Sequence, residues 1–298
     1  MNQTSLSIII PTYNRPQLLA RAVESALAQT IENFEVIVVD DCSTIWNDLP
    51  ENPRLRVIKL SENKGGAAAR NIGVKAAKGC WITFLDDDDC LLPQMAEVSL
   101  AALQKDTSLS RPIAAISGIE VVDEQNRPLQ VRIPPTLPKG SHFGLETIAP
   151  SQSFFTKQTL VIEKQVFEGI GGFDESFSSR IHTELFLRLN LACSILGIPQ
   201  VTYKLLEHQQ YRVSTDPMRR QLSFERLIAK HREIFQAHPK TFADLIFNQA
   251  IMLQKCALTA SAMNSLIVAM QVHPLHTIAR LGSPVKQNLL GNWKKLNF

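Results

Sequence analysis

Four consecutive aspartates, Asp86 to Asp89, follow directly on the apolar segment 80–85. Ligands of open α/β sheets bind beyond the carboxyl ends of the strands, so this position favours a ligand site. Adjacent negative charges repel one another, and a divalent cation that also bridges a phosphate-bearing ligand would offset the repulsion. The alternative is a solvated acidic loop. Because the tetrad follows an apolar strand, we expect a metal site.

A second acidic pair, Asp40-Asp41, follows the apolar segment 34–39 and precedes Cys42-Ser43-Thr44. Taken alone, such a pair is more often part of a turn than of a site. Two acidic strand ends in one sheet, however, favour a ligand that both of them contact.

Two glycine-rich nucleotide-binding motifs are absent from the loops in which they would be expected. The segment Pro11–Pro16 after the first strand contains no glycine, which disfavours a GxGxxG dinucleotide site and hydride transfer. It also disfavours a nucleotidyltransferase, which would need a glycine-rich loop there. Segment 63–71 lacks the GKS or GKT ending of a P-loop.

The elements that would position these residues alternate between strands and helices. Apolar runs predict strands and amphipathic runs predict helices, with Asn14 as a capping residue and Pro16 in the first turn of the first helix. This alternation predicts an α/β fold with a mostly parallel central sheet. The predicted strands are 5–11, 34–39, 55–60 and 80–85, and the predicted helices are 16–29, 67–77 and 93–104.

Beyond Arg111 the pattern is less regular. Pro128, Pro134, Pro135 and Pro138 predict an irregular loop, rather than a sheet element, of the kind that lines a cleft. From about Pro217 the sequence is helix-like, so we expect a C-terminal helical extension over residues 216–298 after a catalytic domain over residues 1–215.

Composition excludes several classes of protein. With 298 residues, 45% of them hydrophobic, the chain can bury a large core, which excludes disordered, collagen-like and coiled-coil proteins. A net charge of +3 is too small for a dedicated nucleic-acid binder, so we expect no nucleic-acid partner. The five cysteines include no CxxC pair, which fits a reducing compartment and indicates no zinc site. The first residues lack a signal-peptide pattern and the longest uncharged stretch is too short to span a bilayer, so we expect a cytoplasmic protein.

Several of these segments, in this order, resemble the family 2 glycosyltransferases, which are nucleotide-sugar-dependent enzymes of the GT-A fold. The resemblance covers about residues 5–215. The matching segments are SIIIPTYNR (7–15), EVIVVDDCST (35–44), NKGGAAARNIG (63–73), FLDDDD (84–89), GGFDESF (171–177) and ELFLRL (184–189).

The resemblance implies a donor site and a metal. Asp86 and Asp88 correspond to the outer aspartates of the family's DXD motif and would bind Mn²⁺ or Mg²⁺, ions that suit hard oxygen ligands. Asp40 or Asp41 would accept a hydrogen bond from uracil. The other residues expected to bind the nucleotide or its diphosphate are Pro11, Thr12, Tyr13, Arg15, Arg70, Asp87 and Arg212.

The expected catalytic base departs from the family pattern. Most relatives carry Glu-Asp three and two residues before the position of Glu184, with the aspartate as base, whereas this chain has Ile181-His182. Histidine can take a proton near neutral pH, so His182 is the first candidate. Glu184 is the second, although Glu184 and Arg188 have the i, i+4 spacing of a helical ion pair. A structural role for both is the third interpretation.

The expected function is metal-dependent, inverting transfer of a sugar from a nucleotide-sugar, most simply a UDP-sugar, as in a hexosyltransferase of polysaccharide biosynthesis. The acceptor would be a glycan or a lipid-linked saccharide. The alternative is a catalytically silent nucleotide-sugar-binding protein, because His182 replaces the acidic base. The tail from Leu266 carries Arg280, Lys286, Lys294 and Lys295, which predict a peripheral contact with the inner membrane face; solvated charges are the simpler interpretation.

Overall fold

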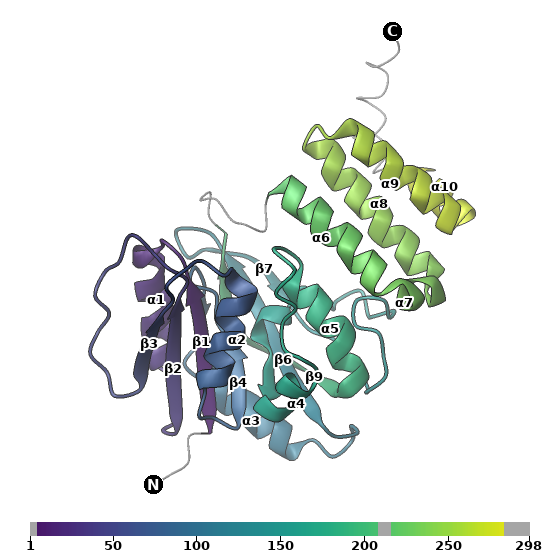
Figure 1. The fold of residues 1–298 in the computed structure, drawn as a ribbon. Coiled ribbons are helices and arrows are strands. Elements are labelled where there is room, and N and C mark those ends of the chain that lie inside the picture. Colours follow the sequence, from purple (N-terminus) through teal and green to yellow (C-terminus); the bar gives the residue numbers. More distant parts are fainter. Residues whose placement is uncertain (1–4, 208–215, 283–298) are drawn as a thin grey trace. The chain divides into compact units, whose positions relative to one another are not determined.

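The computed structural model describes residues 5–207 and 216–282. The chain forms two compact units, residues 1–211 and 212–298. The first unit contains the sheet and five α-helices (Figure 1). Its strands are β1 (Leu6–Thr12), β2 (Phe34–Asp40), β3 (Leu55–Lys59), β4 (Trp81–Phe84), β5 (Cys90–Leu91), β6 (Ile113–Val122), β7 (Pro128–Arg132), β8 (Val161–Glu163) and β9 (Ser194–Leu206). Its helices are α1 (Pro16–Leu27), α2 (Gly66–Ala76), α3 (Met95–Lys105), α4 (Lys164–Gly169) and α5 (Ile181–Ala192), with a 3₁₀ turn, η1, at Lys157–Thr159.

The sheet has the strand order β3-β2-β1-β4-β8-β6-β9-β5, with β7 paired to β6. The first four strands of this order are parallel, as the βαβ pattern predicts. In the other half, β8 is antiparallel to both of its neighbours and β9 is parallel to β6, so the sheet as a whole is mixed. The parallel strands β1, β2 and β4 therefore end at one edge, where Thr12 stands in register with Asp40.

Both faces of the parallel strands β1, β2 and β4 are buried, which explains why these strands read as continuous apolar runs, whereas β3 at the margin is partly exposed. Successive side chains point to opposite faces. Leu6, Ile8 and Ile10 pack in one core with apolar side chains of α1 and α3. Ile9 and Ile37 pack in a second core with side chains of α2, α4 and α5. This two-sided burial fixes the register, and with it the positions of the residues at the strand ends.

The prediction of an irregular loop around Pro128 was wrong in one place. Pro128 begins β7, an exposed strand that pairs only with β6 at the margin of the sheet. Proline removes a backbone donor, and it is tolerated at the first residue of an edge strand because no partner there needs that donor. Pro134, Pro135 and Pro138 lie outside the strands, as expected.

The second unit consists of helices over its described residues. They are α6 (Pro217–Lys230), α7 (Arg232–Ala237), α8 (Pro239–Lys255), α9 (Thr259–Val272) and α10 (Pro274–Gly282). Asp216 caps α6 by accepting hydrogen bonds from the N–H groups of Met218 and Arg219. Within residues 5–207 and 216–282, no helix combines the length and the apolar character that crossing a bilayer would take.

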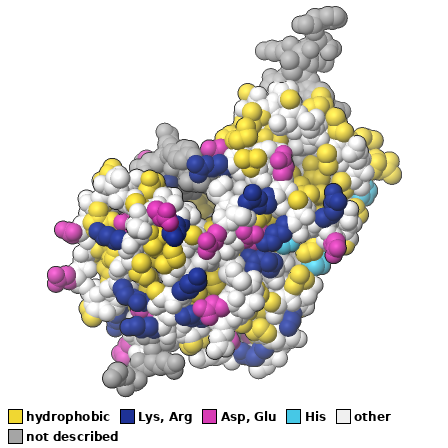
Figure 2. Space-filling view, in the orientation of Figure 1, with side chains coloured by type: hydrophobic (Ala, Val, Ile, Leu, Met, Phe, Trp, Pro, Cys, Tyr) yellow, Lys and Arg dark blue, Asp and Glu magenta, His cyan; other side chains and the backbone are white. Residues whose placement is uncertain are grey.

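The basic residues of the tail are only partly described. Arg280 donates to Asp244 Oδ1 at 2.6 Å and to Asn248 Oδ1 at 3.0 Å within the helical unit. Lys286, Lys294 and Lys295 lie outside the described residues. On the face in Figure 2, basic and acidic side chains are interspersed over the unit that holds the sheet.

Candidate active site

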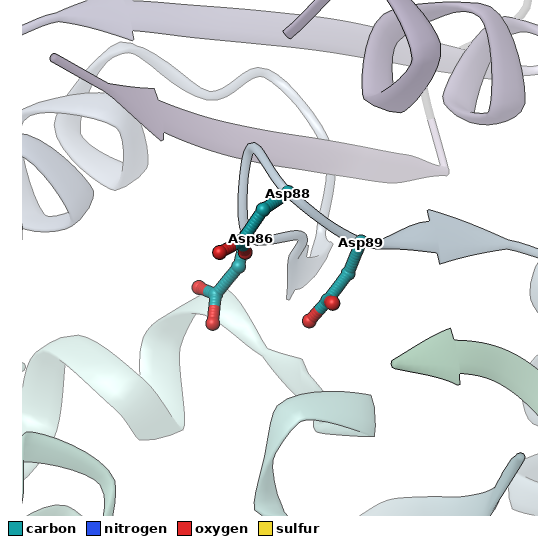
Figure 3. A group of neighbouring side chains, drawn as sticks. All are labelled: Asp86, Asp88 and Asp89. Atoms are coloured by element: carbon teal, nitrogen blue, oxygen red, sulfur yellow. The ribbon is translucent and has the colours of Figure 1, made fainter. Parts of the chain in front are cut away.

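The acidic tetrad forms the turn between β4 and β5. Carboxylate oxygens of Asp86, Asp88 and Asp89 lie within 4.8 Å of one another. Figure 3 shows these three side chains on the turn. The sequence pointed to Asp86 and Asp88; the structure adds Asp89. Its Oδ2 accepts from the hydroxyl of Tyr203 at 2.8 Å, and its Oδ1 accepts from the N–H of Leu206 at 2.9 Å. No local pattern in the sequence marked Tyr203, because the contact depends on β9 reaching this turn.

Two arginines compensate part of the charge of the tetrad. Arg15 Nη1 lies 3.1 Å from both Asp87 Oδ1 and Asp88 Oδ2. Arg70 donates to Asp86. Thr12 Oγ1, at the end of β1, donates to Asp87 Oδ2 at 2.8 Å. Against four carboxyl groups, two guanidinium groups leave an excess of negative charge when all four are ionised.

The pKa values of two aspartates are raised, first by burial and then by the neighbouring negative charges. Burial, with the neighbouring Asp88, raises the pKa of Asp87 to about 6 in spite of Arg15. Burial, with Asp88 and Asp86, raises the pKa of Asp89 well above its usual range. Desolvation and like charges both disfavour the ionised form. Oxygen donors with surplus negative charge are the ligand set that Mn²⁺ or Mg²⁺ takes, so the residues present fit such an ion.

The two aspartates after β2 hold two different loops. Asp40 Oδ1 accepts from the N–H of Ser43 at 3.0 Å and closes the turn in which Cys42 has a φ of 68°. Both carboxylate oxygens of Asp41 accept backbone N–H groups, from Lys64 at 2.7 Å and from Gly65 at 2.8 Å. Asp41 therefore connects the end of β2 to the loop that precedes α2.

The prediction that Asn14 caps α1 was wrong. The residue at the cap position is Arg15, and no side chain forms a capping hydrogen bond there. Asn14 has a φ of 54°, a left-handed conformation that asparagine tolerates. Its Oδ1 instead accepts from the backbone N–H of Thr44 at 2.8 Å, so it joins the loops after β1 and β2.

The remaining residues expected in the donor site differ in exposure. Pro11 is buried within β1, in register with Val39 of β2. Tyr13, two residues farther, has 47% of its surface exposed. Arg70 is buried on α2, and its guanidinium carbon lies 5.9 Å from the ring centroid of Phe173. Arg212 lies outside the described residues.

His182 lies in the first turn of α5, directly after Arg180 and Ile181. Arg180 has a φ of 59°, so the backbone turns sharply at the start of the helix. The ring of His182 contacts Phe173 edge to face, with centroids 5.4 Å apart. Burial and the positive charges of Arg70 and Lys157 lower the pKa of His182 to about 3, although Asp86 opposes the shift. His182 is therefore neutral at physiological pH.

Glu184 is fully buried and paired with Arg188. Arg188 Nη2 lies 2.6 Å from Glu184 Oε2, and Arg188 Nε donates to Oε1 at 2.8 Å. The same guanidinium donates to the carbonyls of Ile170 and Gly172. Glu184 thus orients an arginine that ties α5 to the GGFDESF segment, which favours the ion-pair interpretation of this residue.

The family model described as glycosyl transferase family 2 matches residues 7–160, slightly more than half of the chain. The chain belongs to this family. The matched residues include the ends of β1, β2 and β4, and the GT-A-type α/β fold and the transferase class agree with this family. In this family 2 glycosyltransferase the acidic turn follows β4, at the strand end that the sequence predicted.

Curated relatives support the same family. An uncharacterised glycosyltransferase of Haemophilus influenzae is 31% identical over 216 residues, which are 71% of this chain and 71% of that protein. The putative colanic acid biosynthesis glycosyl transferase WcaA of Escherichia coli is 42% identical over 110 residues, 35% of this chain and 39% of that protein. The succinoglycan biosynthesis protein ExoO of Rhizobium meliloti is 35% identical over 131 residues, 42% of this chain and 36% of that protein.

Among solved structures, TarS residues 1–349 of S. aureus, in complex with UDP-GlcNAc, is similar to this family 2 glycosyltransferase. The TM-score is 0.64 over 92% of this chain and 83% of that chain. Sequence identity is 20%, so the similarity concerns the fold.

Proposed function

We propose that this glycosyltransferase transfers a sugar from a UDP-sugar to a glycan or lipid-linked acceptor, with inversion and with a divalent cation in the acidic turn. The observation that carries the proposal is the group of three close carboxylates at a strand end, with two arginines beside it. The UDP and UDP-GlcNAc complexes of TarS support the donor class. The names of WcaA and ExoO support a role in polysaccharide biosynthesis.

The donor nucleotide would bind at the ends of β1 and β2. Tyr13 is exposed enough to cover a base or ribose, and Thr12, which precedes it at the end of β1, would lie beside the same part of the nucleotide. We assign uracil recognition to Asp41, because Asp40 closes its own turn whereas Asp41 reaches the loop before α2. Each carboxylate oxygen of Asp41 has a second lone pair, so it can accept from a base while it holds the loop.

Asp86 and Asp88, with Asp89 beside them, would hold the cation. When bound, the ion neutralises negative charge on the departing diphosphate. Arg15 and Arg70 already lie at the turn, and either can donate to phosphate oxygens in place of a carboxylate. When the donor enters, the two arginines would exchange carboxylate partners for phosphate oxygens. This change needs no movement of the strands that carry the site.

His182 would take the proton of the acceptor hydroxyl. An inverting displacement needs one base on the face opposite the leaving group. With its pKa lowered to about 3, His182 has a basicity close to that of an unperturbed aspartate, whose pKa is about 3.9. The histidine would thus replace the family's aspartate with a group of similar proton affinity and no negative charge.

The decisive experiment measures nucleotide binding and turnover on the same preparation. A panel of UDP-sugars is incubated with the protein and Mn²⁺, and release of UDP is compared with the rise in melting temperature, which reports binding to the native state. The proposal predicts both for at least one donor. Binding without release of UDP, with or without saccharide acceptors, would favour the silent nucleotide-sugar binder.

A further inference from the structure

One aromatic side chain is exposed between two cations. Phe155 has 67% of its surface exposed, an unusual position for a phenylalanine. Lys157 Nζ lies 5.6 Å from the centroid of its ring, and the guanidinium carbon of Arg132 lies 5.7 Å from it. Arg132 ends β7 and Phe155 follows the loop that bridges to Ile133, so the three side chains come from two segments. We call them the cationic patch.

Lys157 has no carboxylate partner among residues 5–207 and 216–282. Its ammonium group contacts the rings of Phe143, at 5.5 Å, and Phe155. Burial and the positive charge of Arg180 lower its pKa to about 8, so it remains mostly protonated at neutral pH. Lys157 is only partly exposed, and a partly buried cation that lies near another cation and no acid is stabilised when a ligand supplies the anion.

The cationic patch adjoins the proposed base. The ring of Phe143, on which Lys157 lies, packs against Phe186 of α5 with centroids 4.4 Å apart. His182 stands one turn before Phe186 on the same helix, and the charge of Lys157 acts on its pKa. A ligand held by Lys157 would therefore lie on the side of α5 that carries His182.

We propose that the cationic patch binds an acidic group of the acceptor, so that the substrate is an anionic saccharide. The proposal rests on the proposed function, because it takes His182 to mark the acceptor side. Lys157 and Arg132 can pair with a carboxylate or a phosphate, and the exposed ring of Phe155 offers a flat apolar face to the sugar between them. The shared requirement is a negative charge close to the hydroxyl that is glycosylated.

The test compares matched acidic and neutral saccharides on the UDP-loaded protein. One arm uses oligogalacturonides and their carboxyl-reduced counterparts, and the other uses a phosphodiester-linked oligosaccharide and its dephosphorylated counterpart. Binding is measured by calorimetry with UDP and Mn²⁺ at two salt concentrations. We expect at least one acidic probe to bind ten times more tightly than its neutral counterpart, with a preference that falls as salt rises. The arm that shows it identifies carboxylate or phosphate.

Variants locate the preference. Lys157→Gln and Arg132→Gln should each reduce it at least threefold and keep their affinity for UDP. Arg127→Gln is the matched control, since Arg127 lies on the same β6–β7 hairpin but pairs with Asp123 at 2.7 Å. Phe155→Ser changes an exposed side chain and tests the patch even if Lys157→Gln fails to fold.

Two results would overturn the proposal. One is equal binding of acidic and neutral probes in both arms, and the other is a preference that survives all three patch variants. Failure of the proposed function would look different, because the wild type would then either bind no UDP or bind UDP-sugars without releasing UDP.

Discussion

The hydroxyl of Tyr203, on β9, donates a hydrogen bond of 2.8 Å to Asp89, in the acidic turn after β4, across 114 residues of sequence. The N–H of Leu206 holds the other oxygen of the same carboxylate. The position of the turn therefore depends on a strand from the opposite half of the sheet. Because both oxygens of Asp89 are held by β9, the turn that also carries Asp86 and Asp88 is fixed to this strand.

Tyr203→Phe should lower the free energy of unfolding by about 1–3 kcal/mol, because it removes a donor from a buried acceptor. Urea denaturation measures the change. Tyr13→Phe, at an exposed position, is the control and should unfold like the wild type. Equal stability of the three proteins would show that the hydrogen bond of Tyr203 contributes nothing net.

Asp88→Asn should remove most of the Mn²⁺-dependent part of UDP binding, since it takes one charged ligand from the cluster. Calorimetry with UDP, with and without Mn²⁺, should show at least a tenfold loss of affinity, about 1.4 kcal/mol. Asp48→Asn, in an exposed loop, is the matched control. Full wild-type activity in excess chelator would contradict the metal assignment.

Asp41→Asn should weaken UDP binding at least tenfold even without metal, because an amide presents only one acceptor oxygen to the base and to the loop before α2. Asp40→Asn should have a smaller effect on UDP affinity. The order of the two effects in calorimetry decides the assignment, and a larger loss in Asp40→Asn would exchange the two roles.

The pH dependence of transfer should contain no acid limb near pH 6.5 from His182. Because the pKa is lowered to about 3, the ring stays neutral until far below neutrality. Between that value and about 6.5 the unfolded chain binds a proton that the folded chain does not, so this residue makes stability fall as pH falls through that window. His182→Asn should reduce the loss of stability in acid.

The same residue has a kinetic test. His182→Ala should keep UDP affinity and lower transfer by roughly 10²–10⁴, the usual contribution of a general base. His182→Asp should restore part of the rate. A wild-type limb near 6.5 that disappears in His182→Asp would show that the ring is exposed to solvent in the working enzyme.

Glu184→Gln should destabilise the fold strongly, because it leaves Arg188 without its buried carboxylate. Breaking one partner of such a pair costs about 3–5 kcal/mol. Glu168→Gln is the control, since Glu168 is exposed and its contact with Lys164 is 3.8 Å. If Glu184→Gln unfolds like the wild type but transfers no sugar, Glu184 is the base.

Sequence reasoning predicted the parallel half of the sheet because its determinants are local. Runs such as SIIIP and FEVIVV are apolar on both faces, and in an α/β fold such strands lie in the parallel part of the sheet, where helices cover both faces. The acidic residues at their ends were found for the same reason. The pairing of Glu184 with Arg188 was also readable, since residues four apart on a helix are neighbours.

The rest depended on contacts between distant segments. Pro128 suggested a loop because nothing in its neighbours indicates that β7 lies at a sheet margin. Asn14 looked like a helix cap, yet its carbonyl found backbone donors in the loop after β2. The lowered pKa of His182 comes first from burial and then from the charges of Arg70 and Lys157, and all of these arise only in the folded chain.

The bond between Tyr203 and Asp89 also sets an order of events during synthesis. When residues 86–89 leave the ribosome, β1 to β4 are already made, but the strand that holds Asp89 is not. At about 5–20 residues per second, translation reaches Tyr203 roughly 6–23 s later. For that time a nascent chain has the partners of Asp86, Asp87 and Asp88 but not those of Asp89, so the turn gains its last contacts only when β9 joins the sheet.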